Sequence, residues 1–185
     1  YPFEKDILAG SALDFSAMTD APAGKYGHVQ LRDGQFVFAD RPDEPVRFWG
    51  TNIVWGGNFM EKEDAERVAK RLAMMGFNSV RLHHNDARML KENPTSSHDI
   101  DPVKLDQLDY LIYCLKEEGL YVTLELYSSR KFLPHEIDEL DKPVGKGFKA
   151  LVTLSPSARG AWKIFARKLL THTNPYTGMT YAEDP

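Results

Sequence analysis

The sequence predicts an α/β fold built on a parallel sheet, preceded by an extended arm and a β-hairpin. From residue 46 onward, three runs rich in β-branched and aromatic residues alternate with three longer segments of helical periodicity. This order is typical of parallel strands joined by crossover helices. In front of it, Asp33 and Gly34 separate two short alternating runs, which indicates a hairpin. We therefore expect an arm and hairpin over residues 1–45 and three βα units over residues 46–185.

Composition places the chain among ordinary globular proteins, as one domain or as part of a larger one. Its 185 residues are 42% hydrophobic and 27% charged, which is enough to bury a core. The net charge of -4, without a basic stripe, argues against nucleic acid and anionic membranes as partners. The single cysteine, Cys114, excludes an intrachain disulfide and a Cys-based metal site. The chain begins at Tyr1, as a product from which a secretory signal was removed or a trimmed product would, and a secreted or periplasmic protein is our expectation.

The first 25 residues follow neither a strand period nor a helix period, so we expect an extended arm that lies against a core supplied by later residues. The stretch HVQLRDGQFVF, residues 28–38, comes next. Its Asp-Gly pair accepts the positive φ of a type I′ turn, which predicts two antiparallel strands around it.

The first βα unit is predicted from VRFWGTNIVW, residues 46–55, followed by a helix in EKEDAERVAKRLAMMGF, residues 61–77. Gly76 supplies the stop of this helix. One apolar face of the helix is formed by residues three and four apart, namely Ala65, Val68, Ala69, Leu72 and Ala73.

The second unit pairs NSVRLHH, residues 78–84, with a helix that begins at the N-cap Asp101 and Pro102 and stops at Gly119. This helix is expected to bury Leu105, Leu108, Ile112 and Leu115.

The third strand is expected in LYVTLELYS, residues 120–128. A polar stretch that includes the loop-like DKPVGKGFK, residues 141–149, separates it from the last helix. That helix begins at Ser155-Pro156, ends at Asn174-Pro175, and has an apolar face of Ala161, Trp162, Phe165, Ala166 and Leu169.

Alternation along these strands points polar side chains at their carboxyl ends, where α/β folds bind ligands. In the second strand, Val80 and Leu82 face the helices, while the other face carries Ser79, Arg81 and His83. In the third strand, the face opposite Val122, Leu124 and Leu126 carries Thr123, Glu125 and Tyr127. Asn52 and Trp55 close the first strand. The predicted substrate-binding residues are Asn52, Trp55, Arg81, His83, His84, Glu125 and Tyr127.

Three stretches carry a family resemblance, namely RFWGTNIVW, EDAERVAKRLAMMGFNSVRLHHND and LDYLIYCLKEEGLYVTLELY. Over residues 46–172 they resemble the first three βα units of clan A (β/α)8 glycoside hydrolases, particularly cellulase-like family 5 enzymes. The resemblance implies a TIM barrel that acts on a carbohydrate, and it gives Arg81 the role of orienting the catalytic nucleophile. Many members place a His at the end of strand three, where this chain has LELYSS.

The resemblance also implies where the catalytic carboxylates lie. In that clan the acid/base Glu follows an Asn at the end of strand four, and the nucleophile Glu ends strand seven. Both are expected beyond Pro185, so we interpret the chain as the N-terminal part of an enzyme, with the remainder of its own barrel as a partner. Alone it is expected to be inactive and, with an uncovered strand edge, prone to association.

Structural roles stay open for the same residues. Arg81 could pair with Asp86 or Glu125, and His83 could be a core histidine. Trp55, Phe59 and Tyr127 could pack rather than stack on sugars. His83 and His84 are expected on opposite faces of their strand, which argues against one shared metal, so neither a metal nor a cofactor is predicted.

Two further classes of function remain as alternatives to a retaining glycoside hydrolase. One is a non-catalytic carbohydrate-binding or assembly module that uses the same cleft. The other is a barrel enzyme such as a lyase or an isomerase, which would need metal ligands that we do not find in the sequence.

Overall fold

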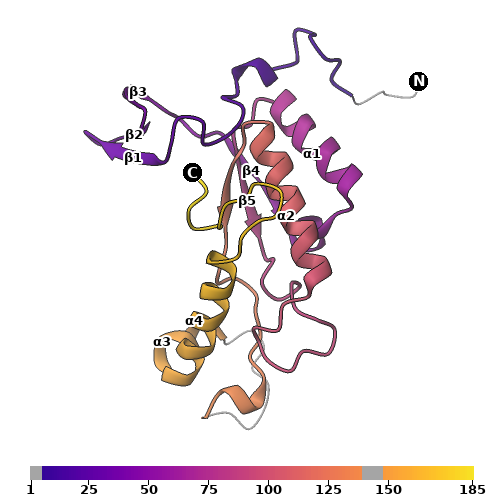
Figure 1. Ribbon diagram of the computed structural model, residues 1–185, viewed down its shortest axis with the longest axis vertical. Coiled ribbons are helices and arrows are strands. Elements are labelled where there is room, and N and C mark those ends of the chain that lie inside the picture. The colour runs from indigo at the N-terminus through magenta and orange to yellow at the C-terminus, as the bar shows by residue number, and fades with distance from the viewer. Residues whose placement is uncertain (1–5, 139–147) are drawn as a thin grey trace.

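The computed structural model describes residues 6–138 and 148–185 of the chain (Figure 1). Its strands form two three-stranded sheets. The antiparallel sheet contains β1 (Val29–Arg32), β2 (Gln35–Phe38) and β3 (Arg41–Pro45), and the parallel sheet contains β4 (Gly50–Val54), β5 (Ser79–His83) and β6 (Tyr121–Leu124). The helices are α1 (Lys62–Met74), α2 (Pro102–Glu117), α3 (Phe148–Leu154) and α4 (Pro156–Leu170), with 3-10 turns η1 (Ser16–Met18), η2 (Trp55–Phe59) and η3 (Pro134–Glu136).

The predicted hairpin is confirmed. β1 and β2 pair antiparallel around Asp33 and Gly34, whose φ angles of 51° and 78° are those that a type I′ turn requires. β3 was not predicted, because its sequence RPDEP contains two prolines, which disfavour a strand. The structure accommodates them because β3 lies at the edge of its sheet, where a missing N–H costs no ladder bond.

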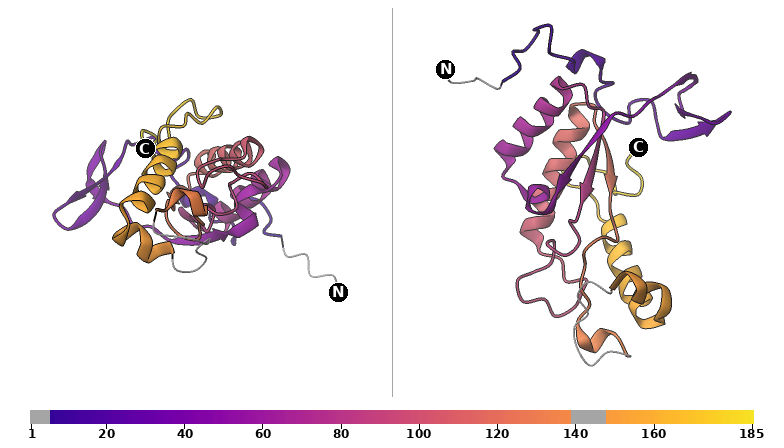
Figure 2. Two further views of the ribbon diagram at one scale, coloured as in Figure 1. Left: turned by 90° about the horizontal axis from the view of Figure 1, so that it is seen from below. Right: turned by 180° about the vertical axis from the view of Figure 1, so that it is seen from behind.

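The parallel sheet has the order β4-β5-β6, and both of its strand pairs are parallel, as the βα alternation predicted. Figures 1 and 2 show α1 and α2 side by side along one face of this sheet. Val80 and Leu82 of β5 are fully buried there, in a core shared with α1, α2 and α4. On the opposite face, the register aligns Asn52, Arg81 and Thr123 in a row of exposed residues. The two faces of the sheet are therefore apolar and polar, as the alternation requires.

The helix signals in the sequence are confirmed by the caps. The Asp101 side chain accepts a hydrogen bond from the Val103 N–H at 2.9 Å, and Ser155 accepts one from the Ala158 N–H at 3.1 Å. α4 ends at Leu170, earlier than predicted, because the chain then turns toward α2. His172 reaches the Asp109 carboxylate at 2.8 Å in this turn, and such a contact is not visible in local sequence.

All three parallel strands are shorter than predicted. The segment before β4 is drawn toward the antiparallel sheet, since the Val46 N–H donates to the Phe36 carbonyl at 2.8 Å. β6 ends at Leu124 because the following loop is bound by a buried carboxylate, that of Asp86. The predicted strand character of residues 125–128 is therefore wrong.

The amino-terminal arm lies against the helices, as expected. The Phe15 N–H donates to the Met74 carbonyl at 3.0 Å, and the Ala23 N–H donates to the Lys116 carbonyl at 2.8 Å. Most of the loop predicted at residues 141–149 lies outside the described residues, but α3 shows that its last two residues are helical. No helix within the described ranges is long and apolar enough to cross a membrane.

Candidate functional site

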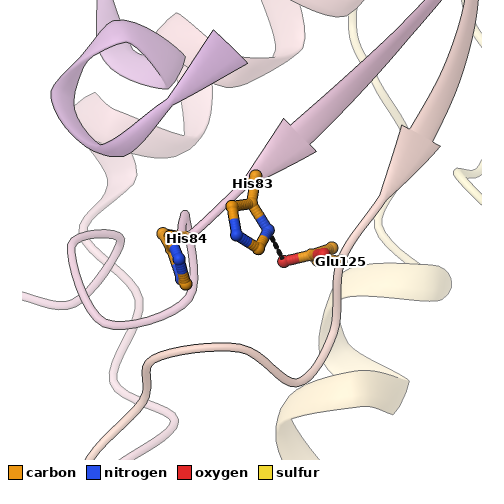
Figure 3. Close-up of side chains that lie close together, drawn as sticks. All are labelled: His83, His84 and Glu125. Atoms are coloured by element: carbon orange, nitrogen blue, oxygen red, sulfur yellow. Dashed lines mark hydrogen bonds and ion pairs between the residues drawn. The ribbon is translucent and has the colours of Figure 1, made fainter. Parts of the chain in front are cut away.

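The carboxylate of Glu125 joins two strands at their carboxyl ends. Its Oε1 pairs with Nη2 of Arg81. Its Oε2 contacts Nδ1 of His83, as Figure 3 shows. Because β5 and β6 run parallel, Glu125 follows the last residue of β6 beside the end of β5. The sequence left the partner of Arg81 open between Asp86 and Glu125, and the structure selects Glu125. The Arg81 side chain is 47% exposed and that of Glu125 is 12% exposed, so the pair opens to solvent.

His84 does not lie on the opposite face from His83, and this prediction was wrong. The strand ends at His83, and His84 takes a left-handed backbone conformation with φ of 56°. The strand period no longer applies there, so the two imidazoles face each other with ring centroids 3.5 Å apart. Figure 3 shows both rings beside Glu125 beyond the end of β5.

Trp55 forms the next layer of the site. Its ring stacks on His84 with centroids 4.3 Å apart and planes 20° apart, and the Arg88 guanidinium lies 5.6 Å from the Trp55 ring centroid. Trp55 directly follows β4 and also has a left-handed backbone, with φ of 54°. Trp55 remains 44% exposed, so this end of the sheet presents an accessible aromatic residue.

Asn58 connects the Trp55 segment to the end of β5, although the sequence analysis did not single it out. Its fully buried side-chain amide donates to the Trp55 carbonyl at 3.0 Å and to the His83 carbonyl at 2.9 Å. One side chain thus ties η2 to the end of β5. The sequence offered no signal for this role, because an Asn in a Gly-Gly-Asn stretch is typical of any turn.

Asp86 is a structural anchor rather than a partner of Arg81. Its buried carboxylate accepts hydrogen bonds from the backbone N–H groups of Ser128, Ser129 and Arg130 and from both serine hydroxyls, at 2.6 to 3.1 Å. Burial alone would raise the pKa of Asp86, but these hydrogen bonds outweigh it and lower the pKa below its ordinary value. The loop that follows Glu125 is thereby held against the segment that follows β5.

Arg130 is a second residue that sequence reasoning missed. It is fully buried, its Nη2 donates to the Ser97 hydroxyl at 2.8 Å, and its guanidinium lies 4.2 Å from the ring centroid of Phe165. Burial lowers the pKa of Arg130 to about 10. It therefore links the loop after β6 to Ser97 and to α4.

The remaining predicted residues divide between the site and the core. Asn52 pairs in register with Arg81 and lies on the same exposed face. Tyr127 is directed elsewhere, because its hydroxyl donates to the Lys149 carbonyl and its ring packs edge-on against Trp162, 6.0 Å away. Phe59 packs against the main core. The structure thus brings together five of the predicted residues, namely Trp55, Arg81, His83, His84 and Glu125. Asn52 lies beside this group.

Electrostatics favour a neutral His83. Burial lowers the pKa of His83, and the neighbouring His84 and Arg81 lower it further by charge repulsion. A neutral imidazole can donate from one nitrogen and accept at the other. Beside a guanidinium and a carboxylate, it completes a set of donors and acceptors suited to hydroxyl groups.

A parallel sheet with helices on one face and polar groups at the carboxyl ends of its strands defines the class of (β/α) barrel proteins. The sequence profile described as Cellulase (glycosyl hydrolase family 5) matches residues 39–169. The chain belongs to this family, as its first three βα units implied. No curated protein matches the chain.

Solved structures from Rhizomucor miehei share the fold. An endo-1,4-beta-mannanase aligns with a TM-score of 0.64 and 17% identity, and a glycoside hydrolase family 5 mannosidase with 0.65 and 19%. A mutant of that mannosidase in complex with mannosyl-fructose aligns with 0.61 and 18%. Each alignment covers 86% of this chain and 46% of the other, so the chain spans less than half the length of these proteins.

Proposed function

We propose that this chain supplies the amino-terminal part of a glycoside hydrolase, and that its substrate is a polysaccharide or an oligosaccharide. One observation carries the proposal: in a chain of family 5, Arg81, His83 and Glu125 meet at the carboxyl ends of β5 and β6 on the face away from the helices. This is the end of the sheet where barrel enzymes bind substrates. An imidazole, a guanidinium and a carboxylate together can hydrogen-bond sugar hydroxyls. Trp55 offers an aromatic face for a pyranose ring.

The reaction that we propose is retaining hydrolysis. Two carboxyl groups about 5–5.5 Å apart would act as nucleophile and acid/base through a covalent glycosyl-enzyme intermediate. We assign neither role to a residue of β4, β5 or β6. The solved structures of this fold are about twice as long as the chain. This supports further strands of the complete barrel as the source of the two carboxyl groups.

Arg81 is the residue of this chain that we place beside the nucleophile. Its pair with Glu125 uses Nη2, and a guanidinium presents five donors in a fixed fork, so Arg81 can hold a second carboxylate at the same time. A positive charge beside a carboxylate favours the ionised, nucleophilic form. Glu125 would then act as the group that fixes the orientation of the fork.

The test is Arg81→Lys in the complete enzyme, which keeps the charge and removes the fork. We expect kcat to fall by about tenfold or more, or about 1.4 kcal/mol per tenfold, with little change in Tm. Arg67→Lys on the exposed side of α1 is the matched control and should leave kcat unchanged. Mannan and mannosyl-fructose are the first substrates to assay, because similar structures carry mannanase and mannosidase titles.

Two results would contradict the proposal. If Arg81→Lys lowers Tm and leaves kcat intact, Arg81 has a structural role. If the complete protein binds oligosaccharides but releases no product from any of them, the protein is a carbohydrate-binding module instead.

A further inference from the structure

We propose that His83, His84 and Glu125 form a binding site for a divalent transition-metal ion of the Zn²⁺ type. Each side chain offers one ligand atom, and these atoms all lie within 4.8 Å of one another. Within residues 6–138 and 148–185, they are the one group of three His, Cys, Asp or Glu side chains that meets this criterion. Figure 3 shows the two imidazoles and the carboxylate gathered beyond the end of β5.

The chemistry of the donors selects the kind of ion. Two imidazole nitrogens and one carboxylate oxygen suit Zn²⁺, Co²⁺, Ni²⁺ or Cu²⁺, whereas Ca²⁺ and Mg²⁺ require ligand sets made mainly of oxygen. Two His and one Glu also leave a fourth position of a tetrahedron for water or another ligand. Ligand atoms around tetrahedral Zn²⁺ are about 3.3 Å apart, since each lies about 2.0–2.1 Å from the ion. The three ligand atoms, which lie within 4.8 Å of one another, would therefore have to move closer together when an ion binds.

His84 supplies an independent observation. Its Nδ1 is buried and has no hydrogen-bond partner in the described part of the chain. A buried nitrogen without a partner costs free energy that a bound ion would recover. The left-handed backbone at His84, with φ of 56°, is what turns this ring onto the side of His83. Without that backbone conformation the two imidazoles would lie on opposite faces of the strand.

Arg81 can remain in place when the ion binds. It pairs with Oε1 of Glu125, whereas His83 contacts Oε2. An ion that binds between His83 and Oε2 replaces that one contact, and Arg81 then orients the carboxylate from outside the coordination shell. The charge of Arg81 opposes a cation, but solvent screens it because the side chain is 47% exposed.

The test measures metal binding directly, so its result does not depend on the proposed hydrolysis. The purified protein is stripped with EDTA, titrated with Zn²⁺ by calorimetry, and titrated with Co²⁺ while its visible spectrum is recorded. We expect one ion per chain, and Co²⁺ bands of a four-coordinate site with nitrogen and oxygen ligands. Glu125→Gln and His84→Asn should each weaken Zn²⁺ binding by about tenfold or more. Asn tolerates the positive φ at position 84.

His135→Ala is the matched control, because His135 is exposed on η3 and outside the group. It should bind Zn²⁺ as the unaltered protein does. X-ray absorption on the Zn²⁺ complex of the unaltered protein requires no variant and should show two imidazoles. The proposal is overturned if Glu125→Gln and His84→Asn bind Zn²⁺ as tightly as the unaltered protein, if His135→Ala weakens binding as much as they do, or if absorption shows fewer than two imidazoles.

Discussion

Trp55 and His84 hold left-handed backbone conformations, with φ of 54° and 56°, where β4 and β5 end. Such conformations cost about 1–3 kcal/mol each for residues other than Gly. Ring stacking between the two residues and the hydrogen bonds of Asn58 offset this cost. The strain has a clear geometric result, because it brings an aromatic face and a second imidazole to the Arg81–Glu125 pair.

Asp86 is the residue whose charge most directly supports the site. The Asp86 carboxylate accepts hydrogen bonds from three backbone N–H groups. In Asp86→Asn, an amide NH₂ replaces one carboxylate oxygen and points a donor at one or more of these N–H groups. We expect a loss of about 2 kcal/mol or more in the free energy of unfolding at neutral pH, measured by urea denaturation. The control is Asp138→Asn, since Asp138 is exposed, and it should change stability little.

The same variant tests the pKa of Asp86, which is lowered from its ordinary value of 3.8. A carboxyl whose folded-state pKa is lowered stabilises the fold above its unfolded value, and this contribution disappears as the pH falls through the folded-state pKa. The stability gap between the unaltered protein and Asp86→Asn should therefore be full at neutral pH and shrink below pH 3.8. A gap that stays constant with pH would show that the carboxylate charge is unimportant.

At the scale of elements, the site depends on how η2 and the loop after β6 are fastened to β5. Asn58 ties η2 to the His83 carbonyl, and Asp86 ties residues 128–130 to the segment that follows β5. Both connections use buried polar side chains whose partners lie far along the chain. Both η2 and the loop after β6 are thus held in place by contacts at the carboxyl end of the central strand β5 or directly after it.

Two substitutions at Asn58 separate loss of a donor from introduction of a charge. Asn58→Ala removes hydrogen bonds to two carbonyls and should cost about 1–3 kcal/mol. Asn58→Asp points a carboxylate at the same carbonyl oxygens, so we expect it to be the more destabilising variant at neutral pH. Urea denaturation followed by tryptophan fluorescence measures both. Equal stability of the two variants would contradict the assigned hydrogen bonds.

At the scale of the whole molecule, the parallel sheet has an order that leaves β4 and β6 at its edges among the described strands. The polar face with Asn52, Arg81 and Thr123 is exposed as well. Unpaired strand edges invite pairing with another chain. In a complete barrel the same edges would be paired and the same face would line the interior.

We therefore expect the 185-residue chain, expressed alone, to self-associate and to lack hydrolytic activity. Size-exclusion chromatography with light scattering should show oligomers whose share rises with concentration. Val54→Lys places a charge on the edge strand β4 and should shift the chain toward monomer. A monodisperse monomer at high concentration with a cooperative melt would contradict this expectation.

Local sequence by itself determined the hairpin, the helix starts at Asp101 and Ser155, the alternation of β5 and the class of fold. Each of these depends on residues that are neighbours in the chain, such as the Asp33-Gly34 turn or a cap and the N–H two or three residues later. The prediction of Arg81, His83 and Glu125 as candidate site residues also followed from period-two alternation.

Only the tertiary structure decided which partners these residues have. Arg81 and Glu125 are 44 residues apart, and Asp86 is 42 residues from Ser128, so no local pattern shows that Glu125 pairs with Arg81 while Asp86 binds the loop. The end of β6 follows from the contacts of Asp86, the position of Tyr127 from its contacts with Lys149 and Trp162, and the turn of His84 toward His83 from the left-handed backbone at His84. Alternation predicts the face of a side chain only while the strand continues, and packing between distant segments decides where it ends.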